Sequence, residues 1–134
     1  MVAKFKYLFL LFLSTNVLAH PKIEARIAQI TQAIKQTPNN SHLYLQRAEL
    51  YREHREFGMA EKDYTQAIAK GEDKNSVAYF QAMLLRDQGK LIAARKLFKQ
   101  VANNVKDESL QLLALVNLAE IYKLDKKWLL AAQN

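Results

Sequence analysis

The sequence contains no cysteine, only three glycines and only two prolines among its 134 residues. Without cysteine the chain has no disulfides, no thiolate metal ligands and no thiol nucleophile. The scarcity of glycine and proline excludes collagen-like and low-complexity chains. Half of the residues are hydrophobic and a quarter are charged, which is typical of one globular domain that is stabilised by packing.

Residues 1–19 have the composition of a secretory signal peptide. Two lysines precede an apolar run over residues 7–13, and Val17 and Ala19 place small side chains before a cleavage point. The apolar run is much shorter than the roughly 20 residues that a membrane span needs. We therefore expect cleavage between Ala19 and His20, and a mature chain in the periplasm or outside the cell with no stable membrane anchor. Loss of the two lysines lowers the net charge from +7 to +5.

The rest of the sequence lacks alternating β-branched segments and has apolar residues three and four positions apart, which is helix spacing. Ser41 is expected to cap the second helix, and Gly71 and Gly89 to lie in turns. Because the connections are short, consecutive helices should pack as antiparallel neighbours. The expected helices span about 21–36, 57–70, 76–88, 91–102 and 108–124, a second helix follows its cap at Ser41, and a seventh begins near Lys127.

The helical segments repeat along the chain. At an offset of 34 residues, residues 44–67 align with residues 78–101, and a third copy over residues 115–122 follows 37 residues further on. A fixed period of this length is the signature of a repeat architecture. The positions that keep their size are Ala48 with Ala82, Ala60 with Ala94, Tyr64 with Phe98, and Tyr51 with Tyr122.

This pattern resembles the tetratricopeptide repeat, a family of helix-turn-helix units of about 34 residues. Small residues occupy the family's helix-crossing positions in the three copies, whereas Arg55 and Lys126 replace the turn glycine. The resemblance implies an all-α fold, an α-solenoid of antiparallel helix pairs with about seven helices. Its units would be a half-unit over 21–38, repeats over 41–74 and 75–108, and a partial third repeat over 112–134. The small residues are Ala48, Ala82 and Ala119 in the first helices and Ala60, Ala94 and Ala131 in the second.

Such arrays bind partners on a concave face lined by the first helix of each unit. By resemblance, apolar residues should lie in mid-groove and basic residues along one margin, and together they would capture an extended or helical peptide. The alternative is that these helix faces are merely solvated. The expected groove residues are His42, Leu45, Glu49, Arg52, Tyr79, Met83, Arg86, Val116, Glu120 and Lys123.

Catalytic and metal sites are not indicated. His54 lies between Glu53 and Glu56 in the sequence, but no nucleophile motif, phosphate-binding glycine loop or His-x-x-x-His pair accompanies it. An amino-terminal His20 could chelate copper only with a second imidazole, and Pro21 indicates a helix start instead. We expect no cofactor, no bound metal and no nucleic-acid partner.

The sequence therefore favours a non-enzymatic adaptor of the cell envelope that binds a peptide or protein segment. The alternative is a structural accessory subunit of an exported enzyme or assembly complex. The third repeat has too short a second helix to cover the apolar side of residues 112–124. We interpret this open end as either a truncation of a longer array or a surface for self-association or subunit docking.

Overall fold

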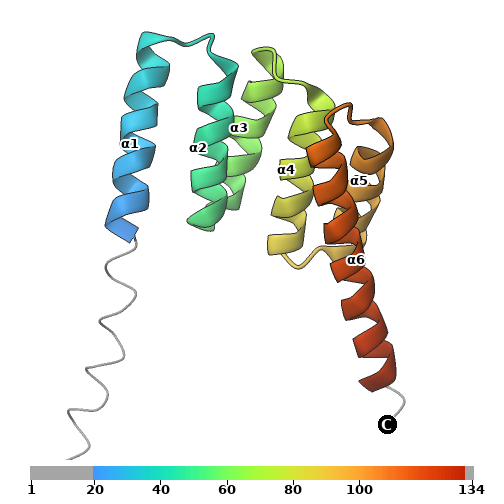
Figure 1. The fold of residues 1–134 in the computed structure, drawn as a ribbon. Helices are drawn as coiled ribbons and strands as arrows, with labels where there is room; N and C mark the ends of the chain where they lie inside the picture. The colour runs from blue at the N-terminus through green and yellow to red at the C-terminus, as the bar shows by residue number, and fades with distance from the viewer. Residues whose placement is uncertain (1–19, 132–134) are drawn as a thin grey trace, which may run out of the picture.

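The computed structural model of the protein describes the backbone of residues 20–131 and the side chains of residues 22–127. The described part is entirely helical, and neighbouring helices pack as pairs in an arrangement like an α-solenoid (Figure 1), which confirms the predicted fold class. The predicted signal peptide lies outside the described residues. The six helices of the described part are α1 (His20–Gln36), α2 (Ser41–Glu53), α3 (Phe57–Ala69), α4 (Lys74–Asp87), α5 (Leu91–Asn104) and α6 (Glu108–Ala131).

The turns that join α2 to α3 and α4 to α5 have the same geometry. Arg55 has φ 63° and Gly89 has φ 75°, and these two residues are 34 positions apart. After each, the following amide donates to a carbonyl five residues earlier, Glu56 to Tyr51 at 2.8 Å and Lys90 to Leu85 at 2.9 Å. A positive φ is uncommon for a residue with a side chain. The Arg55 guanidinium lies over the Phe57 ring, 5.1 Å from its centre.

The closest helix crossings are made by alanines. Ala48, Ala60, Ala82 and Ala94 are all fully buried, so the helices of each pair approach without any gap for a larger side chain. Tyr64 and Phe98 fill equivalent positions beside them and are also fully buried. Two apolar clusters result, one around α2 and α3 and one around α4, α5 and α6, and the half-buried Phe80 packs against both.

A buried ion pair joins the first three helices. The Arg47 guanidinium donates to both oxygens of Asp63, at 2.6 and 2.8 Å, and to the Thr31 hydroxyl at 3.0 Å. It also lies within 6 Å of the centres of the Tyr44 and Tyr51 rings, at 5.9 and 5.8 Å. The hydrogen bond and charge of Asp63 raise the pKa of Arg47 above its ordinary value, so this guanidinium stays charged.

Two predicted helix starts are wrong. Asn40, not Ser41, precedes the first helical residue of α2, and the Ser41 hydroxyl instead donates to Glu72 at 3.1 Å. The fourth helix begins at Lys74 rather than Ser76, because the Asp73 carboxylate caps it by accepting from the Ser76 amide at 2.7 Å. Gly71, with φ 116°, ends α3 as predicted.

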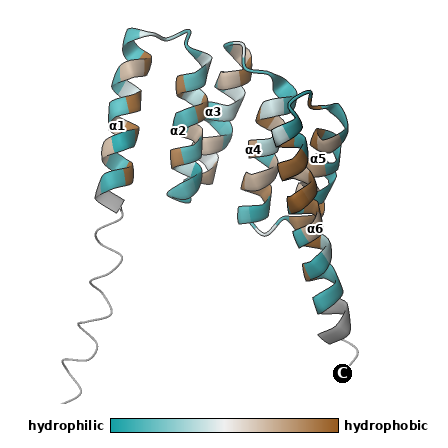
Figure 2. Ribbon diagram, in the orientation of Figure 1, coloured by the Kyte–Doolittle hydropathy of each residue, from teal (hydrophilic) through white to brown (hydrophobic). Residues whose placement is uncertain are grey.

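The predicted break between a sixth and a seventh helix is also wrong. α6 continues without interruption from Glu108 to Ala131, since residues 124–127 contain no glycine or proline to stop it. No helix folds back over this end of the described chain, so Ala119 is exposed, unlike Ala48 and Ala82. Figure 2 shows apolar residues along the upper half of α6 and polar ones below them. The predicted second-helix position at Ala131 lies at the end of α6, and its side chain is outside the described set.

Candidate functional site

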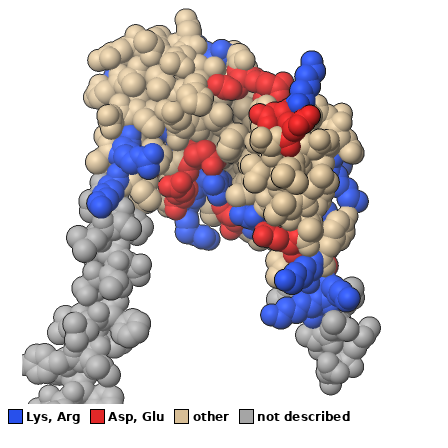
Figure 3. Space-filling model, in the orientation of Figure 1, with Lys and Arg blue, Asp and Glu red and all other residues tan. Residues whose placement is uncertain are grey.

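The candidate site is the inner side of the arch that the helices form. α2, α4 and α6 run in the same direction, so their carboxyl-terminal halves lie toward the same end of the molecule (Figure 1). Acidic and basic side chains alternate along the hollowed lower edge of the surface in the same view (Figure 3). Most of the charged residues expected to line the groove belong to these helix halves.

The first part of the site is a set of hydrogen bonds around Glu49. This carboxylate accepts from the Tyr64 hydroxyl and from the Arg52 guanidinium, the latter at 3.2 and 2.8 Å. Burial, reinforced by the hydrogen bond and charge of Glu49, raises the pKa of Tyr64 well above its usual range. The phenol is therefore a fixed hydrogen-bond donor, not a base, at neutral pH.

Charged groups continue from α2 to α4. The Arg52 guanidinium also donates to Asp87, and a second guanidinium, that of Arg86, lies 3.7 Å from the same carboxylate. Burial by itself lowers the pKa of Arg52, but hydrogen bonds to Glu49 and Asp87 outweigh this effect and raise it. Arg52 is therefore held as a cation between two carboxylates.

The same chain of contacts reaches α6. Arg86 donates to the Asn117 side-chain carbonyl and lies 3.9 Å from Glu120. Asn117 is buried, and its amide donates to the Leu113 carbonyl at 2.8 Å and to the Tyr79 hydroxyl at 3.5 Å. We call the connected residues the inner network. Its members are Glu49, Arg52, Tyr64, Arg86, Asp87, Asn117 and Glu120.

A first pocket, of about 320 Å³, opens beside this network between α1, α2 and α4. Ile30, Leu50 and Phe80 give it apolar walls, and Arg26 and Glu53 add one charge of each sign. Its size suits an apolar side chain whose neighbours can pair with the charged residues. His42, Leu45, Gln46 and Glu49 complete the lining.

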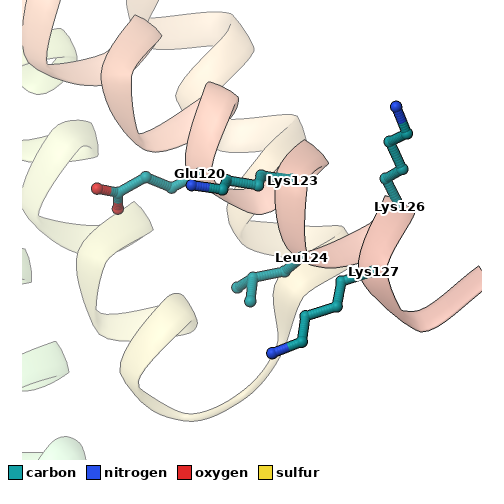
Figure 4. Close-up of a pocket in the computed structure, with 5 residues that line it drawn as sticks. All are labelled: Glu120, Lys123, Leu124, Lys126 and Lys127. Carbon is teal, nitrogen blue, oxygen red and sulfur yellow. The ribbon is translucent and has the colours of Figure 1, made fainter. Parts of the chain in front are cut away.

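A second pocket, of about 610 Å³, lies along the lower half of α6. The side chains of Glu120, Lys123, Leu124 and Lys127 extend to one side of this helix, whereas that of Lys126 points away (Figure 4). Lys123 and Lys127 form no ion pair with any residue of the described range. The pocket therefore combines the apolar side chain of Leu124 with the Glu120 carboxylate and three ammonium groups, those of Lys123, Lys126 and Lys127.

The ten expected groove residues do not share the same surroundings in the structure. Glu49, Arg52, Arg86 and Glu120 meet in the inner network, and His42 and Lys123 line the two pockets. Leu45 and Tyr79 are both buried, each only 8% exposed, although Leu45 also contributes to the lining of the first pocket. Tyr79 packs edge-on against Phe80 and Phe98. Met83 is half-buried against the same cluster, and Val116 is exposed.

Two of the three basic residues expected along one margin of the groove, Arg52 and Arg86, form ion pairs. Arg52 pairs with Glu49 and Asp87, and Arg86 lies near Asp87 and Glu120, whereas Lys123 forms no ion pair with a described residue. Sequence reasoning missed Tyr64 and Asn117 as members of the network. The only local signal for Asn117 is its position, because it is a polar residue on the face of α6 that also carries Ala114, Leu118 and Ile121.

Clusters suited to other chemistry are not found in the described range. No group of three or more His, Asp or Glu side chains there could hold a metal ion. The His54 ring lies between two carboxylates, 2.6 Å from Glu56 and 3.8 Å from Glu24, and so links α1 to the turn after α2. Over the same residues, no helix combines the length and apolar character needed to cross a membrane.

Comparison with known proteins gives no relative: no protein-family model matches the chain, and no curated protein matches it.

Proposed function

We propose that the protein is a non-enzymatic adaptor that binds a segment of another protein along the inner side of its helical arch. The observation that carries this proposal is the first pocket, which combines apolar walls with charged groups of both signs at the junction of three helices. At protein interfaces, anchor side chains of one partner fill pockets of the other, and these contacts carry most of the binding energy. The resemblance to tetratricopeptide repeats, whose concave face binds peptides, supports the same role.

The two pockets define the chemistry of the partner. An apolar side chain fits between Ile30, Leu50 and Phe80. An acidic side chain or a terminal carboxylate fits beside Lys123 and Lys127, which have no anionic partner among the described residues. The expected ligand is therefore an extended segment with an apolar anchor and an acidic group separated along its length.

A binding role agrees with the state of the polar groups better than catalysis does. In the inner network each carboxylate lies against a guanidinium, and the raised pKa of Tyr64 keeps its proton in place. Catalytic acids and bases need pKa values near the working pH. The network instead fixes the relative positions of α2, α4 and α6, on which the shape of the groove depends.

A peptide selection tests the proposal. A displayed random-peptide library is panned against the purified protein, and the recovered peptides should share an apolar residue and an acidic residue. Lys123→Glu with Lys127→Glu should weaken their binding about tenfold or more, since two attractive contacts become repulsive. Lys62→Glu with Lys96→Glu is the matched control, because it makes the same charge change at two exposed residues that line neither pocket.

Two outcomes of this experiment contradict the proposal. One is a library that yields no common sequence. The other is an equal loss of binding in the pocket variant and the control variant, which indicates attraction to net charge only.

We further propose that the protein is exported, on the basis of residues 1–19. Mass spectrometry of the protein from a periplasmic fraction should show a chain that begins at His20. An intact amino terminus would contradict this proposal without affecting the binding experiment.

A further inference from the structure

α6 carries an apolar face that no described helix covers. Ala114, Leu118 and Ile121 are buried against α4 and α5. On the opposite side of the same helix, Leu112 is 62% exposed and Leu115 is 49% exposed. Most large apolar side chains of a soluble domain are buried, so contiguous exposed ones mark interaction surfaces.

The exposed residues follow a heptad spacing. Intervals of four and three residues alternate along the helix, which keeps all members on one stripe facing a partner helix. The stripe begins with an acidic residue and ends with a basic one, and neither forms an ion pair with another described residue. We call it the outer stripe, and its members are Glu108, Leu112, Leu115, Ala119, Tyr122 and Lys126.

The outer stripe has the same spacing read in either direction. Its centre lies at residue 117, so an antiparallel copy of α6 places each member opposite another member of the stripe. Leu115 then faces Ala119 of the second copy, and Leu112 faces Tyr122, so large residues oppose smaller or flat ones. Glu108 faces Lys126 at both ends. A surface that is complementary to itself about a two-fold axis is the requirement for a symmetric dimer.

We infer that the protein forms a homodimer through an antiparallel pairing of α6 with α6 of a second copy. Val116, 47% exposed beside the stripe, then meets its own counterpart near the two-fold axis. The order of charges along the helix selects the antiparallel direction, because a parallel pair would bring Glu108 against Glu108 and Lys126 against Lys126.

The neighbouring charged groups fit the same arrangement. Arg95 and Lys99 of α5 lie at the edge of the stripe, each 5.7 Å from the centre of the Tyr122 ring. Arg95 is paired with Asp125 at 2.7 Å, and Lys99 is free to approach the acidic end of the second copy. Lys126, at the basic end of the outer stripe, also lines the second pocket, and its side chain extends away from those of Lys123 and Lys127 (Figure 4). Leu112, Leu115 and Tyr122 line neither pocket, so the dimer contact does not depend on the proposed function.

Sedimentation equilibrium of the purified protein, from micromolar to near-millimolar concentration, tests this inference. The wild-type protein should approach twice its monomer mass as its concentration rises. Leu115→Glu should raise the dissociation constant by about 100-fold, since each dimer loses two buried leucines and gains two opposed carboxylates. Met59→Glu is the matched control, because Met59 is 43% exposed on α3, a helix that does not pack against α6. Circular dichroism should show equal helix content in both variants.

A charge exchange tests the pairing itself. Glu108→Lys and Lys126→Glu should each weaken the dimer about fivefold, because each variant places like charges at both ends of the contact. An equal mixture of these two variants should recover the wild-type affinity as a heterodimer, since the introduced lysine of one chain then meets the introduced glutamate of the other. A wild-type protein that stays monomeric throughout overturns the inference. A dimer that Met59→Glu weakens as much as Leu115→Glu does, or that the mixture does not restore, overturns it too.

Discussion

The buried pair of Arg47 and Asp63 gives the sharpest test of what holds the first three helices together. Asp63 is 5% exposed at its side chain and Arg47 is 15% exposed, so Asp63→Ala leaves a nearly desolvated guanidinium with Thr31 as its remaining hydrogen-bond acceptor. Breaking a buried pair by removing one partner costs about 3–5 kcal/mol. We expect the lower end, about 3 kcal/mol, because part of the Arg47 side chain reaches water. The melting temperature should fall by roughly 10 °C.

The second unit shows how the pair can be replaced. At the offset of 34 residues, Gln81 and Leu97 occupy the positions of Arg47 and Asp63. The double variant Arg47→Gln with Asp63→Leu removes both charges together, and uncharged replacements of buried pairs are often nearly neutral. It should unfold within about 1 kcal/mol of the wild type in urea, monitored by circular dichroism. A double variant as unstable as Asp63→Ala, or an Asp63→Ala that changes stability by less than about 0.5 kcal/mol, would refute this account.

Three further changes follow from the packing and the inner network. Ala48→Leu and Ala82→Leu should each lower the free energy of unfolding by about 1–3 kcal/mol in urea, whereas Ala119→Leu should leave it nearly unchanged at low protein concentration, because only the first two alanines are buried. Tyr79→Ala should lower the free energy of unfolding by about 3 kcal/mol in the same assay, since it empties the space beside Phe80 and Phe98. A decrease below about 0.5 kcal/mol would indicate that Tyr79 is a surface residue of the groove. The folded state raises the pKa of Tyr64, so above pH 10.0 the unfolded chain loses this proton before the folded chain does, and the free energy of unfolding should fall as the pH rises. Tyr64→Phe should show a shallower fall when unfolding curves are measured in parallel. An identical fall in the two proteins would contradict the hydrogen bond from Tyr64 to Glu49.

The helices and their pairing could be predicted from the sequence because the signals are local. Apolar residues three and four apart define the helices, and Gly71 supplies the positive φ that ends α3. The alanines at a constant offset mark the closest crossings, and four of them are fully buried. These short-range features do not depend on the details of tertiary packing, as long as neighbouring helices stay in contact.

The break after residue 124 was inferred from the repeat period and not from a local signal. The sequence there is Leu124-Asp-Lys-Lys127, which favours continued helix. Helix periodicity also does not determine which side of a helix is covered. Tyr79 belongs to the expected groove by position, but its ring is buried against Phe80 and Phe98.

The inner network was the least predictable part because its bonds join residues far apart in the chain. The contact from Arg52 to Asp87 spans 35 positions, and that from Arg86 to Asn117 spans 31. Each of these residues is of a type that is common on solvated helix faces, so none of them indicates a contact when the sequence is considered alone. Only the packing of α2 beside α4, and of α4 beside α6, brings them within hydrogen-bond distance.

The continuity of α6 links the two proposed surfaces. A turn after Leu124 would fold a seventh helix over Ala119 and Tyr122, and the outer stripe would become part of the core. Because the helix instead runs on to Ala131, Lys126 extends the stripe to the length at which it can pair with Glu108 of a second copy. The same extension carries Lys127 along the inner side and completes the second pocket. One local property of the sequence, the lack of a helix breaker near residue 125, therefore provides both an available outer face and the basic end of the groove.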